Sequence, residues 1–294
     1  MEIIPFDKRI GFIWLNGVFV EWQNATTHVL NHGLHYGSCV FEGLRVYASN
    51  IYKLEKHTDR LFHSANRMGI EIPYSKEALN QAQLDTIKKM KIDYGYIRPV
   101  IWRGSEMMAI SAQKNKINVA IATWEWPSYF SPEDRLKGIS LQTADWRRPP
   151  SNSIPTDAKA AGLYMICTLS KHKAEKEGFT DALMLDVDGK VCESTGSNIF
   201  FVFNGELHTP IPHCFLDGIT RQTAISIAKN NGIKVVERDI FPEEIKEAQE
   251  IFLTGSAVEI TPVGKIDKQE FKIGEITKLI SELYLKEVDT NYKK

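Results

Sequence analysis

Short runs of alternating apolar and polar residues fill the first part of the chain, and this period of two predicts β-strands. The run FIWLNGVFVEW, at residues 12–22, places Asn16-Gly17 between two apolar segments, which predicts a hairpin with a tight turn. After a strand at residues 38–47, apolar residues return at helical spacing in HTDRLFHSANRMG, which ends at Gly69. The pattern then predicts a helix at residues 76–89 and strands at residues 96–104 and 118–126.

The second part of the chain intersperses strands with helices. Two hairpins are predicted, at residues 181–194 with a turn at Asp188-Gly189, and at residues 198–209 with a turn at Asn204-Gly205. The other predicted strands are at residues 139–146, 233–238, 251–255 and 259–266, and the helices are at residues 160–176, 220–230 and 274–285. Strands and helices in both parts predict an α/β or α+β fold class.

A connector between two domains is predicted near Trp126, where the segment WPSYFSP interrupts the periodic pattern. The length of 294 residues also suits two domains, at about 150 residues each. We therefore predict a small N-terminal α/β domain at residues 1–125, a connector at residues 126–135 and a large C-terminal domain at residues 136–294.

Composition and charge exclude several classes of protein. Hydrophobic residues make up 43% and charged residues 25% of the chain, which is typical of a globular protein. The formal net charge is −1, so the strongly basic face of a nucleic-acid-binding protein is not expected. No apolar run approaches the ~18 residues of a membrane span, and the N-terminus does not resemble a signal peptide. We therefore expect a cytoplasmic protein.

Histidine and cysteine spacing gives little support for a metal site. His28, His32 and His35 lie close together in HVLNHGLH, but Gly33 and the strand-like residues that follow argue against the helix that would align them. The four cysteines are widely spaced and form no C-x-x-C pair, so neither a zinc knuckle nor a disulfide framework is indicated. We expect no metal site.

A few residues could take part in chemistry, although each also has an ordinary structural interpretation. The segment GITRQT places Gly218 before a helix start, whose free N–H groups would suit an anion or simply need a cap. Lys159 is flanked by small apolar residues, and burial there would favour a neutral amine, as a Schiff-base lysine requires. Glu193 ends a predicted strand, and Arg60 could pair with Glu55 or Asp59.

Taken in order, seven segments of the chain resemble one family of enzymes. They are LHYGSCVFEGLR, HTDRLFHSA, YIRPV, DAKAAGLY, LMLDVDGKVCESTGSNIF, LDGITR and LTGSAVEITPV. Together they resemble the fold-type IV, pyridoxal-phosphate-dependent aminotransferases, and most closely the branched-chain amino acid aminotransferases. The resemblance extends from about residue 14 to residue 285. It implies a two-domain fold with pyridoxal 5'-phosphate in the interdomain cleft.

The resemblance also implies which residues bind the cofactor. Lys159 would form the Schiff base with the cofactor aldehyde and then act as the base that moves the substrate proton. Glu193 would face the pyridine nitrogen, and Tyr164 would hydrogen-bond the ring oxygen. Arg60 would bind the phosphate. The cofactor-binding set is completed by Gly196, Ile219, Thr220 and Ser256.

A second set of residues would bind the substrate. Arg98 would receive the side-chain carboxylate of glutamate, and Ala257 would offer a backbone N–H to the α-carboxylate. Phe41 and Tyr36 of the partner subunit would line the site for the apolar side chain. The remaining members of this predicted pocket are Tyr96, Trp126 and Tyr129.

Several positions depart from the branched-chain pattern. Ser197 stands where many of these enzymes have glutamate, Ser256 replaces a common threonine, and Ala161 replaces a common glycine. Arg103-Gly104 resembles the Arg-Gly pair with which D-amino acid aminotransferases bind a carboxylate.

The sequence thus predicts a homodimeric or larger branched-chain amino acid aminotransferase that moves amino groups between L-leucine, L-isoleucine or L-valine and 2-oxoglutarate. Two alternatives keep the same fold: a D-amino acid aminotransferase, which Arg103 favours, and an aminodeoxychorismate lyase. A third alternative is a protein that holds the cofactor without catalysis, which the presence of Lys159, Glu193, Tyr164 and Arg60 argues against.

Overall fold

The computed structural model describes residues 4–126 and 137–289, which form two compact units. The first unit comprises the described residues up to Trp126 together with Ala158–Gly162, and the second comprises the rest. From residue 127 onward, the predicted connector lies outside the described residues. Residues 158–162 group with the first unit because the Phe41 N–H donates a hydrogen bond to the Lys159 carbonyl and Val40 forms a bridge with Ala160. The predicted domain bounds stay a prediction.

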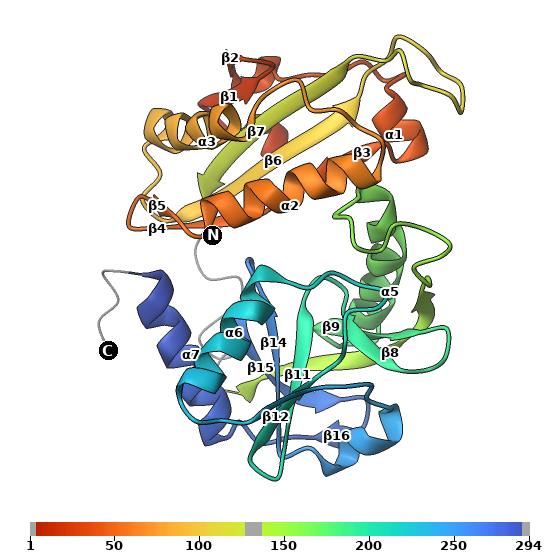
Figure 1. The fold of residues 1–294 in the computed structure, drawn as a ribbon, viewed down its shortest axis with the longest axis vertical. Coiled ribbons are helices and arrows are strands. Elements are labelled where there is room, and N and C mark those ends of the chain that lie inside the picture. Colours follow the sequence, from red (N-terminus) through yellow and green to blue (C-terminus); the bar gives the residue numbers. More distant parts are fainter. Residues whose placement is uncertain (1–3, 127–136, 290–294) are drawn as a thin grey trace. The chain divides into compact units, whose positions relative to one another are not determined.

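The first unit is an antiparallel sheet with helices packed against it (Figure 1). The strand order is β2-β1-β7-β6-β4-β5, and β3 also pairs with β6. Its helices α2 and α3 pack against each other, and α3 also packs on β1, β6 and β7. The strands are β1 Phe12–Leu15, β2 Val18–Glu21, β3 Cys39–Phe41, β4 Leu44–Tyr47, β5 Asn50–Ile51, β6 Gly95–Arg103 and β7 Ile117–Glu125; the helices are α1 His32–Tyr36, α2 Leu54–Arg67 and α3 Lys76–Met90, with 3-10 turns η1 Phe6–Lys8 and η2 Trp22–Asn24.

The predicted strand at residues 38–47 is interrupted, and this interruption shapes the site described below. Glu42 and Gly43 separate β3 from β4, and the Glu42 N–H donates to the Pro99 carbonyl of the neighbouring strand. Gly43 is required because a Cβ there would lie 1.7 Å from the Tyr96 hydroxyl oxygen. The break leaves the Glu42 side chain fully buried.

One helix differs from the expectation. Gly33 argues against a helix in HVLNHGLH, yet α1 forms there, with the Asn31 side chain accepting a hydrogen bond from the Leu34 N–H. Glycine suits this position because α1 is a single short turn packed closely on β6. A Cβ at residue 33 would lie only 3.0 Å from the Trp102 side chain.

The second unit is built on a larger sheet with strand order β10-β9-β8-β15-β14-β11-β12-β13. Helix α5 packs on β8 and β9, while α6 and α7 pack on β14 and β15, respectively, and on each other. The strands are β8 Ile139–Arg148, β9 Asp181–Asp186, β10 Val191–Ser194, β11 Asn198–Phe203, β12 Glu206–Thr209, β13 Val235–Glu237, β14 Glu250–Gly255, β15 Glu259–Ile266 and β16 Gln269–Glu270; the helices are α5 Tyr164–Lys176, α6 Ile219–Asn230 and α7 Glu275–Val288, with 3-10 turns η3 Ala161–Leu163 and η4 Pro242–Glu247.

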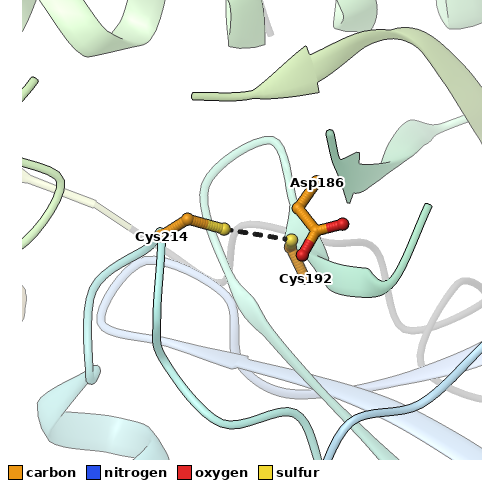
Figure 2. Close-up of side chains that lie close together, drawn as sticks. All are labelled: Asp186, Cys192 and Cys214. Atoms are coloured by element: carbon orange, nitrogen blue, oxygen red, sulfur yellow. Dashed lines mark hydrogen bonds between the residues drawn. The ribbon is translucent and has the colours of Figure 1, made fainter. Parts of the chain in front are cut away.

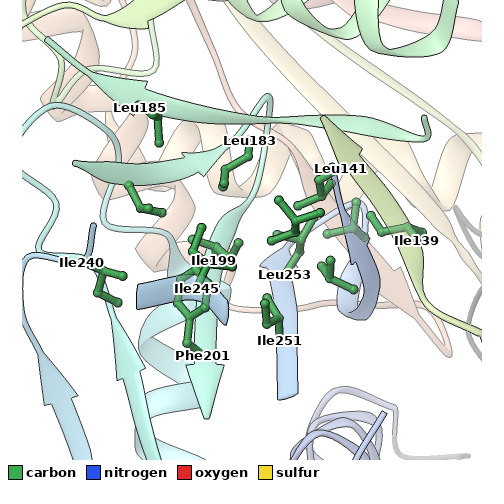
Figure 3. Packing of buried hydrophobic residues seen from close by; sticks show 14 residues of the cluster. Ile139, Leu141, Leu183, Leu185, Ile199, Phe201, Ile240, Ile245, Ile251 and Leu253 are labelled. Atoms are coloured by element: carbon green, nitrogen blue, oxygen red, sulfur yellow. The ribbon is translucent and has the colours of Figure 1, made fainter. Parts of the chain in front are cut away.

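The core of the second unit fills one face of this sheet. In Figure 3, apolar side chains from β8, β9, β11 and β14 gather into one cluster, and η4 contributes Ile245. Leu141, Leu183 and Leu253 in this cluster are completely buried. Such burial contributes ~1.5–3 kcal/mol for each large aliphatic side chain, so the cluster holds the strands in register. In the described ranges, every helix is too short or too polar to cross a membrane.

Candidate functional site

Lys159 is held in the first unit by its own backbone. Its N–H donates to the Ser64 hydroxyl of α2 at 2.9 Å, and its carbonyl accepts from the Phe41 N–H at 3.1 Å. The Lys159 Nζ atom lies 5.0 Å from the centre of the Phe41 ring. These contacts fix the lysine against β3 and α2.

The surroundings of Lys159 disfavour its charged form. Burial lowers the pKa of Lys159, and the Arg60 guanidinium lowers it further, while Glu42 acts in the opposite direction. A lysine with a lowered pKa has a larger fraction of neutral amine, which is the nucleophilic form. The structure therefore supplies an amine able to attack an aldehyde.

Arg60 is oriented by a buried carboxylate that the sequence did not single out. The Glu42 carboxylate accepts two hydrogen bonds from Arg60, with Nε–Oε1 at 2.6 Å and Nη2–Oε2 at 3.0 Å. It also contacts His57, with Nδ1–Oε2 at 2.8 Å. The carboxylate that pairs with Arg60 thus comes from the break between β3 and β4, and the sequence had suggested partners only on the arginine's own helix.

Glu42 remains ionised although it is buried. Burial alone would raise its pKa, but Arg60 and His57 together hold the pKa of Glu42 far below its usual range. A two-point contact between a carboxylate and a guanidinium fixes the plane of the arginine. Glu42 is therefore a positioning residue for Arg60, and an acidic residue within the apolar run CVFEGL was its only signal in the sequence.

An arginine and several aromatic rings extend this site within the first unit. Arg98 on β6 lies over the Phe41 ring at 4.6 Å, and its Nη2 donates to the Tyr96 hydroxyl at 3.3 Å. Tyr96 in turn packs against Trp126, with ring centres 4.7 Å apart. An apolar wall beside one guanidinium can accept either an apolar or an anionic side chain.

Two other predicted pocket residues are placed differently. Tyr36 ends α1, stacks on His32 with ring centres 4.5 Å apart and is 48% exposed. Tyr129 lies outside the described residues.

Arg103 is already engaged by backbone oxygens. Its guanidinium donates to the carbonyls of Gly69 and Ala112. It lines an open pocket of about 610 Å³ together with Pro73 and Asn115. Two carbonyl partners leave fewer N–H groups for a substrate carboxylate than a guanidinium normally offers.

Glu193 is the predicted site carboxylate of the second unit. It is buried on β10, and its Oε1 lies 3.6 Å from Nε of Arg148, while its Oε2 accepts a long hydrogen bond from Asn198 at 3.5 Å. Arg148 itself is buried and donates to the Cys214 carbonyl at 3.2 Å. Neither Arg148 nor Asn198 was singled out from the sequence, because both meet Glu193 only through sheet pairing.

Asn198 links Glu193 to the start of α6. Asn198 is the register partner of Glu193 on β10 and of Thr254 on β14. Its Oδ1 accepts the Gly218 N–H at 3.2 Å, and a Cβ on Gly218 would lie 2.2 Å from that oxygen. The sheet register therefore brings the α6 N-terminus next to Glu193.

The N-terminus of α6 has the properties of an anion site. Within the described part of the chain, no side chain caps this helix after Gly218, and Ile219 and Thr220 are buried in its first turn. Helix N–H groups and the helix dipole both favour a bound anion. The same end of the sheet carries Ser256 and Ala257, which follow β14 and are half-buried.

The last two predicted cofactor residues also belong to the second unit. Gly196 is exposed in the turn between β10 and β11. Tyr164 is the first residue of α5 and is half-buried.

The three histidines do not converge on a shared point. Both ring nitrogens of His32 have partners, Ser38 Oγ at 2.7 Å and the Ala109 carbonyl at 2.9 Å. His28 accepts the Leu30 N–H, and His35 contacts the Val29 carbonyl. These contacts give each histidine a structural role.

Comparison with known proteins gives consistent results. The model of the family described as amino-transferase class IV matches residues 39–266. A branched-chain-amino-acid aminotransferase of Pseudomonas aeruginosa is 39% identical over 283 residues, covering 94% of this chain and 92% of that protein. The structure of the T.th. branched-chain amino acid aminotransferase with pyridoxamine 5'-phosphate superposes with a TM-score of 0.93 at 36% identity, covering 97% of this chain and 96% of the other. The same enzyme complexed with N-(5'-phosphopyridoxyl)-L-glutamate gives a TM-score of 0.92.

Proposed function

The chain belongs to the class IV aminotransferase family, and from this premise we propose that it is a branched-chain amino acid aminotransferase with pyridoxal 5'-phosphate as its cofactor. It would transfer the amino group of L-leucine, L-isoleucine or L-valine to 2-oxoglutarate, in both directions. The observation that carries the proposal is the half-buried Lys159 amine, whose pKa is lowered beside Arg60 and its positioning residue Glu42.

The residues present fit pyridoxal phosphate. Its aldehyde requires a neutral amine, which the lowered pKa of Lys159 favours, and its phosphate requires donors of the kind that Arg60 and the uncapped start of α6 offer. Its pyridine nitrogen requires a carboxylate, which Glu193 supplies from a buried position. When bound, the cofactor supplies an aldehyde that links to amines and a ring that accepts electrons from the substrate.

We assign the proton transfers to two side chains. The amine of Lys159, once released from the cofactor, would take the proton from the substrate Cα and return it in the reverse half of the cycle. Glu193 would keep a proton on the pyridine nitrogen, and the Arg148 guanidinium lies 3.6 Å from its carboxylate. Tyr164 would donate to the ring oxygen.

We assign phosphate binding to Arg60, Ile219, Thr220 and Ser256, with Gly196 lining the cofactor.

For the substrate, Arg98 would receive the side-chain carboxylate of glutamate, while Phe41, Tyr96 and Trp126 would accept an apolar side chain. Support for Arg98 comes from its place over the Phe41 ring beside the Tyr96 hydroxyl. Ala257 would bind the α-carboxylate, and Tyr36 of the partner subunit and Tyr129 complete the proposed pocket.

A cytoplasmic homodimer, with domains at residues 1–125 and 136–294, is proposed on the family resemblance.

The D-amino acid alternative rests on Arg103. Its guanidinium faces an open pocket, which favours carboxylate binding, but its contacts with the Gly69 and Ala112 carbonyls oppose it. We therefore retain the L-branched-chain assignment.

The role of Lys159 is tested by substitution. Lys159→Ala should remove the visible absorbance of the covalently held cofactor and abolish turnover, because no other amine would occupy its position. Lys278→Ala, which removes an exposed lysine from α7, is the matched control and should keep both. A Lys159→Ala protein with the activity of the wild type would exclude the assigned mechanism.

A further inference from the structure

Two cysteines that are far apart in the sequence meet in the second unit. Cys192 lies on β10, and Cys214 lies on the connection between β12 and α6. Their sulfur atoms are 3.4 Å apart, and the two residues are 2% and 5% exposed, respectively. Figure 2 shows the two thiols pointing toward each other. This pairing was not foreseen from the sequence, where 22 residues separate the cysteines.

The two thiols have different acidities. The hydrogen bond with Cys192 lowers the pKa of Cys214, and the Arg148 guanidinium acts in the same direction against the effect of burial. The same hydrogen bond, together with burial, raises the pKa of Cys192. Cys214, whose carbonyl accepts a hydrogen bond from the Arg148 guanidinium at 3.2 Å, is therefore the thiol better placed to become a thiolate, with Cys192 as the neighbouring thiol that can resolve an oxidised product.

The other two cysteines lack this arrangement. Burial raises the pKa of Cys39 to about 11 and that of Cys167 to about 11. Both therefore remain thiols at neutral pH and react slowly. They provide internal controls for any reaction of the pair.

A metal ion is a weaker explanation for the same cluster. Asp186 lies within 4.8 Å of both sulfur atoms and would complete a set of three donors. Its Oδ1, however, already accepts the N–H groups of Asp188 and Lys190, each at 2.9 Å. Structural zinc sites usually have four ligands, and the nearby Arg148 guanidinium repels a cation. The arrangement suits a thiolate and a thiol better than a bound metal.

We propose that Cys192 and Cys214 are a reversible oxidation site at which a peroxide converts the dithiol into a disulfide. The Cys214 thiolate attacks one peroxide oxygen, the O–O bond breaks, and hydroxide leaves as a sulfenic acid forms. The Cys192 thiol then attacks the Cys214 sulfur, and its proton leaves with the sulfenic oxygen as water. In total, two thiols lose two electrons and two protons, and hydrogen peroxide becomes two molecules of water.

The disulfide would act on the site through Arg148 and Glu193. Cys192 directly precedes Glu193, and the Cys214 carbonyl accepts the hydrogen bond of Arg148, whose Nε lies 3.6 Å from Glu193. Bond formation draws the sulfur atoms from 3.4 Å to ~2.05 Å, through rotation of the two side chains and movement of the backbone segments that carry them. Movement of either segment would displace the Glu193 carboxylate or the Arg148 guanidinium that pairs with it.

Formation of the disulfide is tested on the purified protein with dilute hydrogen peroxide. Of the four thiols, two should be lost, and peptide mass analysis should find one disulfide joining Cys192 to Cys214 that dithiothreitol reverses. Cys192→Ser should still form a sulfenic acid at Cys214, trapped by dimedone, whereas Cys214→Ser should react slowly. Cys39→Ser is the control and should keep the disulfide. Thermal melting of each variant verifies that it is folded.

The effect on the site is measured separately. The oxidised holoenzyme should transfer amino groups at least several-fold more slowly, should recover with dithiothreitol, and should show a changed pH dependence of the cofactor's visible absorbance. This second effect rests on the proposed role of Glu193, whereas disulfide formation does not, so the two can fail independently. Four unreacted thiols, a disulfide between other cysteines, or co-purified zinc that protects the pair would overturn the proposal.

Discussion

At the scale of single residues, the site depends on ionisable groups whose neighbours set their charge. Burial and Arg60 lower the pKa of Lys159, and Arg60 and His57 lower the pKa of Glu42. Removing one partner therefore changes the charge or the direction of another. Two substitutions test the roles assigned on this basis.

Glu193→Gln should retain the cofactor but slow proton removal from the substrate by about 10²–10³, a typical loss for one well-placed electrostatic group. A neutral amide cannot stabilise a protonated pyridine nitrogen. The rate is measured from cofactor absorbance after mixing with L-leucine, and Glu206→Gln, at a partly exposed carboxylate, is the control. A near-native rate in Glu193→Gln would leave this residue with a structural role only.

Arg98→Met should lower kcat/KM for L-glutamate and 2-oxoglutarate by ~10- to 150-fold while sparing L-leucine. The lost contact is a hydrogen bond between charged groups, worth ~1.5–3 kcal/mol. Arg103→Met is the matched comparison and should have a smaller effect on L-leucine and L-glutamate, because its guanidinium already binds two carbonyls. An equal loss for every substrate in Arg103→Met would instead make Arg103 the ligand of the α-carboxylate.

At the scale of elements, the sequence predicted local structure well and long-range pairing poorly. The turns at Asn16-Gly17 and Asn204-Gly205 were predicted because both residues of each have the positive φ that asparagine and glycine tolerate. The break between β3 and β4 could not be predicted, since it depends on Tyr96, which lies on another strand. Helix α2 starts at Leu54, three residues before the predicted residue 57, because helix ends are the part of an element that sequence periodicity defines least.

The start of α6 gives a test at this scale. Gly218→Ala would push a Cβ to 2.2 Å from the Asn198 Oδ1 and so displace the first turn of the helix. An anion at a helix N-terminus gains as much as ~2 kcal/mol, so the affinity for pyridoxal phosphate should fall by up to ~30-fold. Ser226→Ala, on the exposed face of α6, is the control. Unchanged cofactor affinity in Gly218→Ala, measured by fluorescence titration, would exclude this helix from phosphate binding.

At the scale of the whole molecule, composition and periodicity predicted only a mixed α/β fold class and a connector near Trp126. Neither Lys159 nor Arg60 could be distinguished from ordinary surface residues by those patterns, and only the ordered resemblance of seven segments assigned them roles. Glu42, Arg148 and Asn198 were missed because their partners are distant in sequence and meet them only after the sheets form. Side-chain contacts made across a sheet are not encoded in local periodicity.

The most direct test of the account is a single-turnover measurement with the wild-type holoenzyme. The protein is mixed with L-leucine, and the loss of the aldehyde form of the cofactor is followed by visible absorbance; 2-oxoglutarate is then added, and L-glutamate is quantified. We predict conversion by L-leucine, recovery of the original spectrum with 2-oxoglutarate, and one L-glutamate formed for each active site. Faster conversion by D-alanine than by L-leucine would contradict the branched-chain assignment.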